Sequence, residues 1–303
     1  MSSFFHTDTS AEKSSSLLAQ AEIDALLQAV NEQITLHTFD FNDQQILQRM
    51  VQGLADPRGS VRSQVAEILG EIGETATPLL INAVANHPDP VMRRSAAKAL
   101  TLIADPAAIP TLLQAVLQDE DATVRGSAMG ALARIGEASV PYLLAILESP
   151  DYPESTKGYA AWALASIGPE ATDQVYRTLS SESVDVRCAG VGAIARIAKE
   201  RAEERAFRVL ITTLTDPDPV VRTVAVAALG QLRYKPAVPH LILALQDTDG
   251  EVRKAVVSAL GRIGERTALV HLTALLNDEV DAVQQLVMLA IAQIETHSET
   301  PLD

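Results

Sequence analysis

The chain has 303 residues, of which 47% are hydrophobic but only 4% are aromatic. Its 24 Lys and Arg residues stand against 39 Asp and Glu residues, which gives a formal net charge of -15. So acidic a chain lacks the basic face that phosphate binding needs, and nucleic acid is therefore not expected as a partner. The aliphatic, Ala-rich composition favours closely packed helices over a β-sandwich.

The cysteine content and the N-terminal residues also limit the class of protein. Cys188 is the only cysteine, so we expect neither a disulfide framework nor a thiolate cluster for zinc. Met1 to Ser16 is polar and contains no apolar signal core, and no run of about eighteen apolar residues is found. We therefore predict a cytoplasmic protein without a membrane span.

The N-terminal region is expected to contain a tail and a capping helix. Residues 1–14 are rich in Ser and Thr and are predicted to be flexible. Apolar residues then recur with helical spacing, which predicts an N-terminal capping helix over residues 15–37. A helix that closes a repeat array needs a polar outer face. A repeat array is predicted over residues 40–296, followed by a second tail over residues 297–303.

A recurring motif runs through most of the chain. A polar, usually basic, lead residue is followed by aliphatic residues seven and ten positions later. The lead residues lie 31, 32, 32, 30, 35, 31 and 31 positions apart, and a nearly constant period in this range is typical of a solenoid. They are Arg62, Arg93, Arg125, Lys157, Arg187, Arg222, Arg253 and Gln284.

Each repeat is predicted to contain two helices. Proline marks the opening turn of the first helix, where a missing N–H costs nothing, at Pro78, Pro110, Pro141 and Pro239. Four positions before the lead residue, the second helix has good N-cap residues at Asp89, Asp121, Ser183, Asp218 and Asp249. Two positions further back lies a second acidic column: Asp56, Asp119, Asp151, Asp216, Asp247 and Asp278. The predicted fold is all-α, a right-handed α-solenoid of about eight two-helix repeats with an N-terminal capping helix.

The pattern Asp-x-x-x-x-Val-Arg-x-x-Ala-x-x-Ala-Leu-x-x-Ile-Gly resembles the HEAT-like repeats of the phycobilisome lyase type, over roughly residues 40–296. In that family the Arg and Asp columns are understood to form a ladder between neighbouring repeats, so the resemblance implies a structural role for these charges. Lys157 and Gln284 depart from the Arg column. The longest interval holds a charged insert, Lys199 to Arg205, which is expected to form a longer helix or a loop. It is either a tolerated surface insertion or a docking point.

The second helices usually line the concave side of such a solenoid, so their exposed positions are candidates for partner binding. Helical spacing predicts that positions three, four and seven after the lead residue are buried and that positions one, two, five and nine are exposed. Glycine within a helix costs about 1 kcal/mol relative to alanine. The glycines of repeats three to five therefore indicate either close approach of a partner or tight helix packing. They are Gly126, Gly130, Gly158, Gly190 and Gly192.

One repeat adds aromatic residues to this surface. Trp162 is the only tryptophan, and both it and Tyr159 occupy positions predicted to be exposed. Their segment looks like the Tyr-Ala-Ala-Trp segment of E/F-type phycobilin lyases, which attach or detach linear tetrapyrroles on antenna proteins, although Ala163 stands where that family tends to have a second aromatic. Cys188 would either hold a bilin transiently or act as small packing filler. The predicted binding residues are Gly126, Gly130, Gly158, Tyr159, Trp162, Cys188 and Gly192.

No catalytic or metal-binding constellation is evident in the sequence. His240 and His271 occupy matching places in two first helices but have no carboxylate partner, so no metal site is predicted. No phosphate loop and no Gly-x-Ser-x-Gly elbow is found. We predict no catalytic residue and no resident cofactor, although a bilin could be bound as a substrate.

These observations predict a scaffold that binds a protein partner along its concave face. The resemblance implies that the partner is a phycobiliprotein or another phycobilisome component, in chaperone, assembly or turnover work. One alternative is a phycobilin lyase or isomerase that attaches or detaches a linear tetrapyrrole. The other is a general HEAT-repeat adaptor unrelated to pigments.

Overall fold

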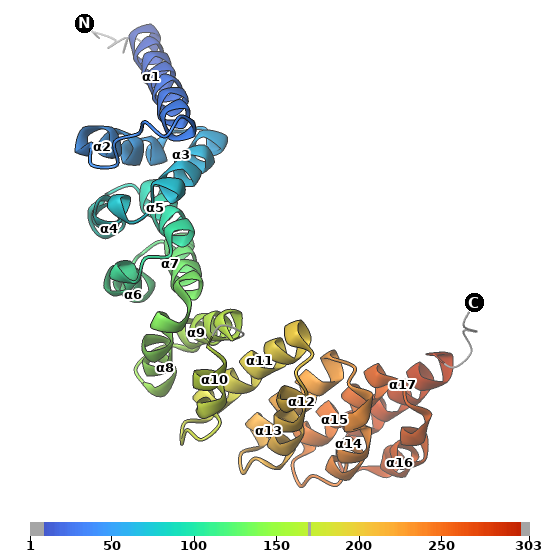
Figure 1. The fold of residues 1–303 in the computed structure, drawn as a ribbon. Helices are drawn as coiled ribbons and strands as arrows, with labels where there is room; N and C mark the ends of the chain where they lie inside the picture. Colours follow the sequence, from blue (N-terminus) through green and yellow to red (C-terminus); the bar gives the residue numbers. More distant parts are fainter. Residues whose placement is uncertain (1–8, 169–170, 298–303) are drawn as a thin grey trace, which may run out of the picture. The chain divides into compact units, whose positions relative to one another are not determined.

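The computed structural model describes residues 9–168 and 171–297, and every regular element within them is a helix (Figure 1). The predicted all-α class is confirmed. The first helix, α1 (Thr9–Thr35), begins six residues before the expected start at Ser15. The other α-helices are α2 (Gln44–Gln52), α3 (Gly59–Ile72), α4 (Thr77–Asn86), α5 (Pro90–Ile103), α6 (Ile109–Gln118), α7 (Ala122–Ile135), α8 (Val140–Glu148), α9 (Glu154–Ile167), α10 (Thr172–Thr178), α11 (Val184–Arg201), α12 (Glu204–Thr212), α13 (Pro219–Gln231), α14 (Val238–Ala244), α15 (Gly250–Ile263), α16 (Leu269–Thr273) and α17 (Asp281–His297).

The helices after α1 form eight two-helix repeats, from the pair α2 and α3 to the pair α16 and α17. In every second helix the lead residue is the fourth residue, as Arg62 is in α3 and Arg253 is in α15. The predicted register is therefore confirmed. The chain divides into two compact units, residues 1–139 (unit 1) and residues 140–303 (unit 2), and each is described by itself.

Unit 1 is an α-solenoid with its first and second helices in separate rows. Figure 1 shows α2, α4 and α6 in one row and α3, α5 and α7 in the other, and each second helix packs on the next. Helix α1 covers the open end and contacts α2 and α3. The Arg58 guanidinium joins this cap to the first repeat, because it forms ion pairs of 2.9 Å with both Asp24 of α1 and Asp56.

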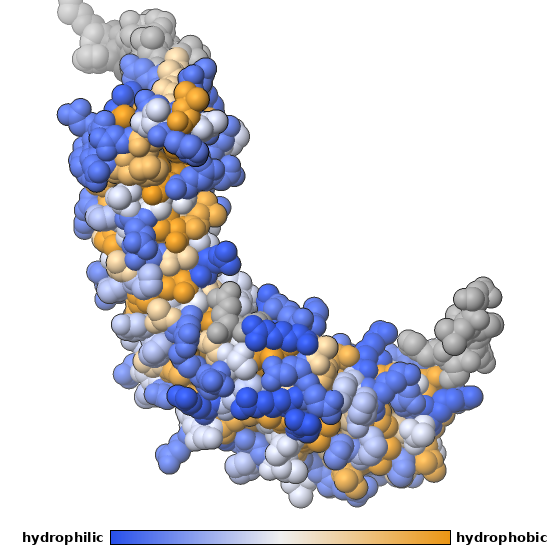
Figure 2. All heavy atoms as spheres, viewed as in Figure 1, coloured by the Kyte–Doolittle hydropathy of each residue, from blue (hydrophilic) through white to orange (hydrophobic). Residues whose placement is uncertain are grey.

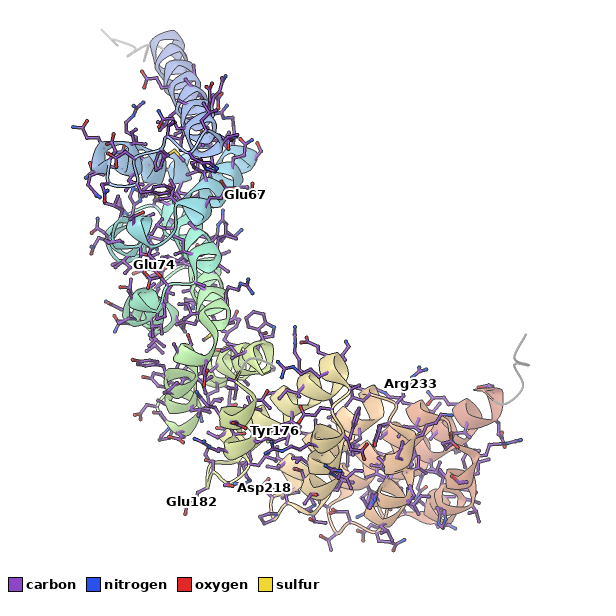
Figure 3. The ribbon with its side chains drawn as sticks, in the orientation of Figure 1. Glu67, Glu74, Tyr176, Glu182, Asp218 and Arg233 are labelled. Atoms are coloured by element: carbon purple, nitrogen blue, oxygen red, sulfur yellow. The ribbon has the colours of Figure 1, made fainter. Side chains whose placement is uncertain are left out.

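Unit 2 has the same kind of arrangement within itself, with α9, α11, α13, α15 and α17 packed in order. The charged insert mainly lengthens a helix, since α11 has 18 residues where α9 has 14. It packs on α10: the Arg205 guanidinium lies 4.0 Å from the ring centre of Tyr176 (labelled in Figure 3), and the Tyr176 hydroxyl donates to Glu203 at 3.3 Å. Burial and the Glu203 charge raise the pKa of Tyr176 to about 12, so the hydroxyl stays protonated.

The predicted helix starts are confirmed by their hydrogen bonds. The Asp89 carboxylate accepts from the Val91 N–H at 2.9 Å, and the Asp249 carboxylate accepts from the Glu251 N–H at 2.8 Å. Such a cap satisfies a backbone donor that has no partner inside the helix. The same role is filled by Asp121, Ser183 and Asp218, and proline stands in the opening turn of α4, α5, α6, α13 and α14.

Burial along the second helices follows the predicted pattern except at positions two and four. Position four was expected to be buried, but this was wrong for Met288 of the last repeat, which is 57% exposed. Position three is buried in all eight repeats, from Val65 to Val287. Position two was expected to be exposed, but this was wrong for Ser95 and Ala189, which are buried. At about 100° per residue, position two lies at the edge of the exposed arc. The Ser95 hydroxyl also donates to the Val91 carbonyl at 2.7 Å, so its burial leaves no polar atom unsatisfied.

One stretch, Ala122–Glu148, has the length and mean hydropathy of a membrane-spanning helix. In the structure it comprises α7, the 3-10 turn Gly136–Ser139 and α8, and Gly136 interrupts it with a φ of 80°. The apolar side chains of α7, such as Val124 and Leu132, are fully buried, and α7 packs on α5 and α6. These residues form the core of a repeat.

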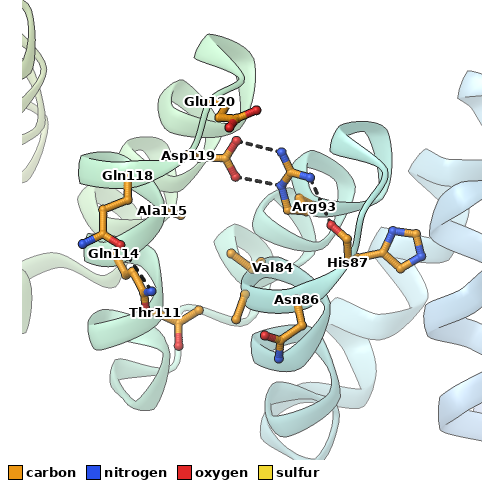
Figure 4. Close-up of a pocket in the computed structure, with 11 residues that line it drawn as sticks. Val84, Asn86, His87, Arg93, Thr111, Gln114, Ala115, Gln118, Asp119 and Glu120 are labelled. Atoms are coloured by element: carbon orange, nitrogen blue, oxygen red, sulfur yellow. Dashed lines mark hydrogen bonds and ion pairs between the residues drawn. The ribbon is translucent and has the colours of Figure 1, made fainter.

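An arginine ladder joins successive repeats. The Arg93 Nη1 donates to the carbonyls of His87 at 3.0 Å and Pro88 at 2.9 Å, while its Nε and Nη2 donate to the Asp119 carboxylate of the next repeat at 2.7 and 2.8 Å (Figure 4). Each guanidinium thus ties the turn before its own helix to the turn of the following repeat. The same set of bonds is formed by the pairs Arg187–Asp216, Arg222–Asp247 and Arg253–Asp278.

The ladder acids are fixed as carboxylates from two sides. The hydrogen bond from Arg253 lowers the pKa of Asp278 despite its burial, and the Val280 N–H adds a second bond at 2.9 Å. Burial opposes ionisation of Asp247, but the Arg222 guanidinium and the Asp249 N–H outweigh it, so the pKa of Asp247 also lies below its ordinary value.

Four lead positions, Arg62, Arg125, Lys157 and Gln284, depart from this geometry. The Arg125 guanidinium bonds the carbonyls of its own turn, Asp119 at 2.7 Å and Glu120 at 3.1 Å. Arg62 bonds the carbonyls of its own turn at 2.6 and 3.1 Å, but His87 occupies the acidic column of the next repeat. Lys157 faces Ser181 in that column and pairs with Asp185 instead, at 2.5 Å. Gln284, in the last repeat, retains only the carbonyl contact, to Asp278 at 2.7 Å.

We expect Arg222→Ala to lower the free energy of unfolding by about 3 kcal/mol, because it leaves the largely buried Asp247 carboxylate without its partner. Urea unfolding followed by circular dichroism measures this loss. Arg262→Ala is the control, since that side chain is exposed. Equal urea midpoints for the two variants would contradict the stabilising role of the arginine ladder.

The ladder also predicts a loss of stability in acid. The pKa values of Asp56 and Asp278 are lowered mainly by hydrogen bonds from Arg58 and Arg253, so the folded state binds fewer protons than the unfolded state near the ordinary aspartate pKa of 3.8. Their stabilisation is complete above that value and is lost as the pH falls through the lower folded pKa. Urea midpoints should fall steeply below about pH 4, and Asp278→Asn should reduce this dependence.

Candidate binding surface

The aromatic residues predicted for the binding surface are exposed on α9. Trp162 is 54% exposed and Tyr159 is 42% exposed. They lie three positions apart, which places them on the same side of the helix. Ala160, between them in the sequence, is fully buried, so the helix turns Ala160 to the core and leaves both rings partly exposed.

Four of the five helical glycines face open space. A Cβ atom added at Gly126, Gly130, Gly158 or Gly192 would meet no neighbouring atom within 4 Å. At Gly190 it would collide with the Thr178 hydroxyl of α10. Tight packing therefore explains Gly190 alone. The other four each forgo about 1 kcal/mol of helix stability without a packing reason, and they leave the backbone bare.

The predicted site residues fall on two separate parts of the chain. Gly126 and Gly130 lie on α7 in unit 1. The other five lie in unit 2, on α9 and α11, which pack against each other. We call these five residues the α9–α11 surface: Gly158, Tyr159, Trp162, Cys188 and Gly192.

The Cys188 thiol is poorly suited to act as a nucleophile. Burial, with the nearby charges of Asp185 and Asp218, raises its pKa to about 11. Only about one thiol in ten thousand is then ionised at neutral pH, and the thiolate is the reactive form. These properties favour the interpretation of Cys188 as packing filler.

A hollow of about 540 Å³ adjoins the α9–α11 surface. Gly192 lies in its floor, and Arg196 and Lys199 line it from α11. The Arg196 guanidinium pairs with Glu200 at 2.6 Å. Figure 2 shows strongly hydrophilic side chains over α11 and α12. The sequence analysis missed this charged border, although Arg196 occupies position nine and Lys199 opens the insert.

The surface carries no recognisable catalytic arrangement. Within the residues that the structure describes, no three His, Cys, Asp or Glu side chains gather as metal ligands. His240 and His271 are both exposed on first helices. What the α9–α11 surface offers is a contact area: two flat rings, bare backbone and a charged border.

A family model for HEAT repeats matches residues 77–155 and 207–292, which together exceed half of the chain. The chain belongs to the HEAT-repeat family. The matched regions take in α4 to α8 and most of α12 to α17.

One curated relative of this HEAT-repeat protein is a bilin biosynthesis protein, MpeU, from Synechococcus sp. (strain WH8020). The two are 36% identical over 91 residues, which is 30% of this chain and 31% of that protein. The match thus spans about a third of the relative's length. This match agrees with the resemblance noted in the repeat motif.

Solved structures of several repeat proteins are also similar. One is the complex of CpcE and CpcF of phycocyanin lyase from Nostoc sp. PCC7120, which is 21% identical in sequence. The match covers 82% of this chain and 94% of that chain, with a TM-score of 0.34. Kap121p is 15% identical, with 82% and 37% covered and a TM-score of 0.47. A designed armadillo repeat protein is 19% identical, with 82% and 99% covered and a TM-score of 0.36.

We expect Trp162 to emit at long wavelength and to be quenched by iodide, because its ring is half exposed and this is the only tryptophan. The unmodified protein is sufficient, and emission spectra with increasing iodide give the answer. Urea-unfolded protein supplies the reference for full quenching. Blue-shifted emission that resists iodide would place Trp162 in the core and exclude it from any binding surface.

Proposed function

We propose that this HEAT-repeat protein is a scaffold that binds a protein partner on the α9–α11 surface, with Trp162 as the central anchor. The observation that carries the proposal is the exposure of Trp162 beside glycines whose missing side chains no packing requires. Aromatic anchors contribute a large share of binding energy at protein interfaces. Bare helix backbone at Gly158 and Gly192 lets a partner approach more closely than any other residue would.

The proposed partner is a phycobiliprotein or another phycobilisome component, handled in the cytoplasm during assembly, chaperoning or turnover. The similarity to a bilin biosynthesis protein over 91 residues supports this choice. So does the Tyr-Ala-Ala-Trp segment, which lies on the proposed contact surface.

A second candidate function is bilin attachment or isomerisation, which the same similarity favours. The exposed rings of Tyr159 and Trp162 offer flat faces on which a linear tetrapyrrole could stack. The raised pKa of Cys188 argues against covalent capture of the pigment at that thiol. The contribution of the surface would then be positioning, which can by itself supply a large part of a rate enhancement.

We expect Trp162→Ala to weaken binding of purified phycobiliproteins by about 2 kcal/mol or more, as for a central aromatic anchor. Gly192→Leu should block the surface sterically without removing a contact, because a side chain at that position extends into open space. Biolayer interferometry against phycobiliproteins from dissociated phycobilisomes measures both.

Ser258→Ala is the matched control, since Ser258 occupies position five of α15 as Trp162 does in α9. Circular dichroism should show that all three variants stay folded. Wild-type affinity in both surface variants would refute the α9–α11 surface. If no phycobiliprotein binds to the wild type, the partner assignment is wrong, whereas quenching of Trp162 fluorescence by free biliverdin would favour the second function.

A further inference from the structure

A separate hollow of about 300 Å³ opens on the second helices of unit 1, between α3 and α5. Arg62 and Glu67 line it from α3, and Arg94, Lys98 and Leu102 line it from α5. Figure 3 places Glu67 on the side of α3 that faces away from α2 and α4. The hollow therefore belongs to the second-helix face, and we call it the α3–α5 hollow.

The two cations of its α5 wall have no partner within the described part of the chain. Arg94 is half-buried and Lys98 is exposed, one helical turn further on. Neither forms an ion pair or a hydrogen bond with a described residue. Their neighbour Arg93 is fully engaged by Asp119 and two carbonyls. The chain has 24 basic and 39 acidic residues, so its net charge is negative. Two cations without an ion pair in one hollow give this place a local positive charge.

The acids near these cations form no ion pair with them. The Asp121 carboxylate, which lies within electrostatic range of Arg94, caps α7 by accepting from the N–H groups of Thr123 and Val124. Glu67 faces Arg94 and Lys98 across the hollow without an ion pair, and it also lines a second hollow on the α1 side of α3. The α5 wall is therefore basic. The α3 wall carries one carboxylate, Glu67, and Arg62, whose guanidinium bonds the carbonyls of its own turn.

The hollow also has an apolar edge that is held in place. Leu102 is 53% exposed, although it is a large aliphatic side chain. Gly70 of α3 lies against it, and a Cβ atom there would be 2.9 Å from the Leu102 Cβ. Helix α5 packs on α7, which presents the open glycines Gly126 and Gly130 at the same register as Arg94 and Lys98. The basic wall of α5, the apolar Leu102 and the bare backbone of α7 thus lie next to one another within unit 1.

We propose that the α3–α5 hollow binds an acidic peptide segment of a protein partner. Arg94 and Lys98 receive its carboxylates, since a guanidinium and an ammonium both form charge-assisted bonds to carboxylate. Leu102 contacts an aliphatic neighbour of the acidic residue, and the peptide continues over the bare backbone of α7. This site is independent of the α9–α11 surface and would remain if that proposal failed.

An acidic peptide fits the hollow better than a nucleic acid does. A long polyanion would meet the net charge of -15 over most of its length, whereas a short segment meets only the local cations. Glu67 at the opposite wall accepts an N–H of the peptide backbone but would repel a continuous phosphate chain.

The test uses the full-length protein and a short fluorescein-labelled peptide of alternating Glu and Leu, followed by fluorescence anisotropy. The wild type should bind it, and added salt should weaken the binding. The double variant Arg94→Glu, Lys98→Glu should lose affinity by about tenfold or more, because charge reversal replaces attraction by repulsion. Arg262→Glu, Arg266→Glu changes the net charge equally at exposed positions of unit 2 and should bind like the wild type.

Three results would overturn the proposal. The first is an absence of binding by the wild type while its circular dichroism is normal. The second is an equal loss of affinity in both double variants, which would indicate net charge rather than the hollow. The third is equal binding of a single-stranded oligonucleotide of the same charge, which would indicate a general anion effect. Leu102→Ser tests the apolar edge and should weaken binding of this peptide more than binding of one that alternates Glu and Gly.

Discussion

The structure depends on a guanidinium that bonds in two directions. In Arg222, one nitrogen caps the carbonyls of the preceding turn and the other two hold the Asp247 carboxylate of the next repeat. The geometry needs a planar fork, which lysine lacks. Lys157 replaces arginine in the one repeat that faces Ser181 in the acidic column, and its ion pair is with Asp185, outside the column. Because each of these bonds reaches only the following repeat, every repeat is stabilised by its nearest neighbours alone.

The exposed positions of the second helices contribute neither to the core nor to the bonds between repeats. Positions three and seven supply the core, and the lead residue supplies the connection between repeats. Positions one and five can then carry any side chain that the fold tolerates. In unit 1 they carry Arg94 and Lys98, and in unit 2 they carry Gly158 and Trp162. Substitutions at positions one and five can thus change the binding surface without a change in helix packing.

The sequence was most informative where the determinants are local. The repeat register, the N-caps and the exposure of Trp162 follow from spacing and from backbone donors that need a nearby acceptor. It was less informative where contacts come from other helices. The new partner of Lys157 lies four residues off the column, and the difference between Gly190 and Gly192 appears only when Thr178 of α10 is in place. The free cations of α5 likewise depend on which acids the fold engages elsewhere.

The last rung has a consequence for how the chain can change in length. Gln284 closes its own turn through Asp278 but has no charge to offer a following repeat. A duplicated segment whose arginine meets an aspartate, as Arg222 meets Asp247, would keep this bond at the new junction. One added beyond α17 would meet a neutral amide and gain no such bond. The identity of residue 284 therefore determines whether a repeat placed after α17 could be joined by the same bond.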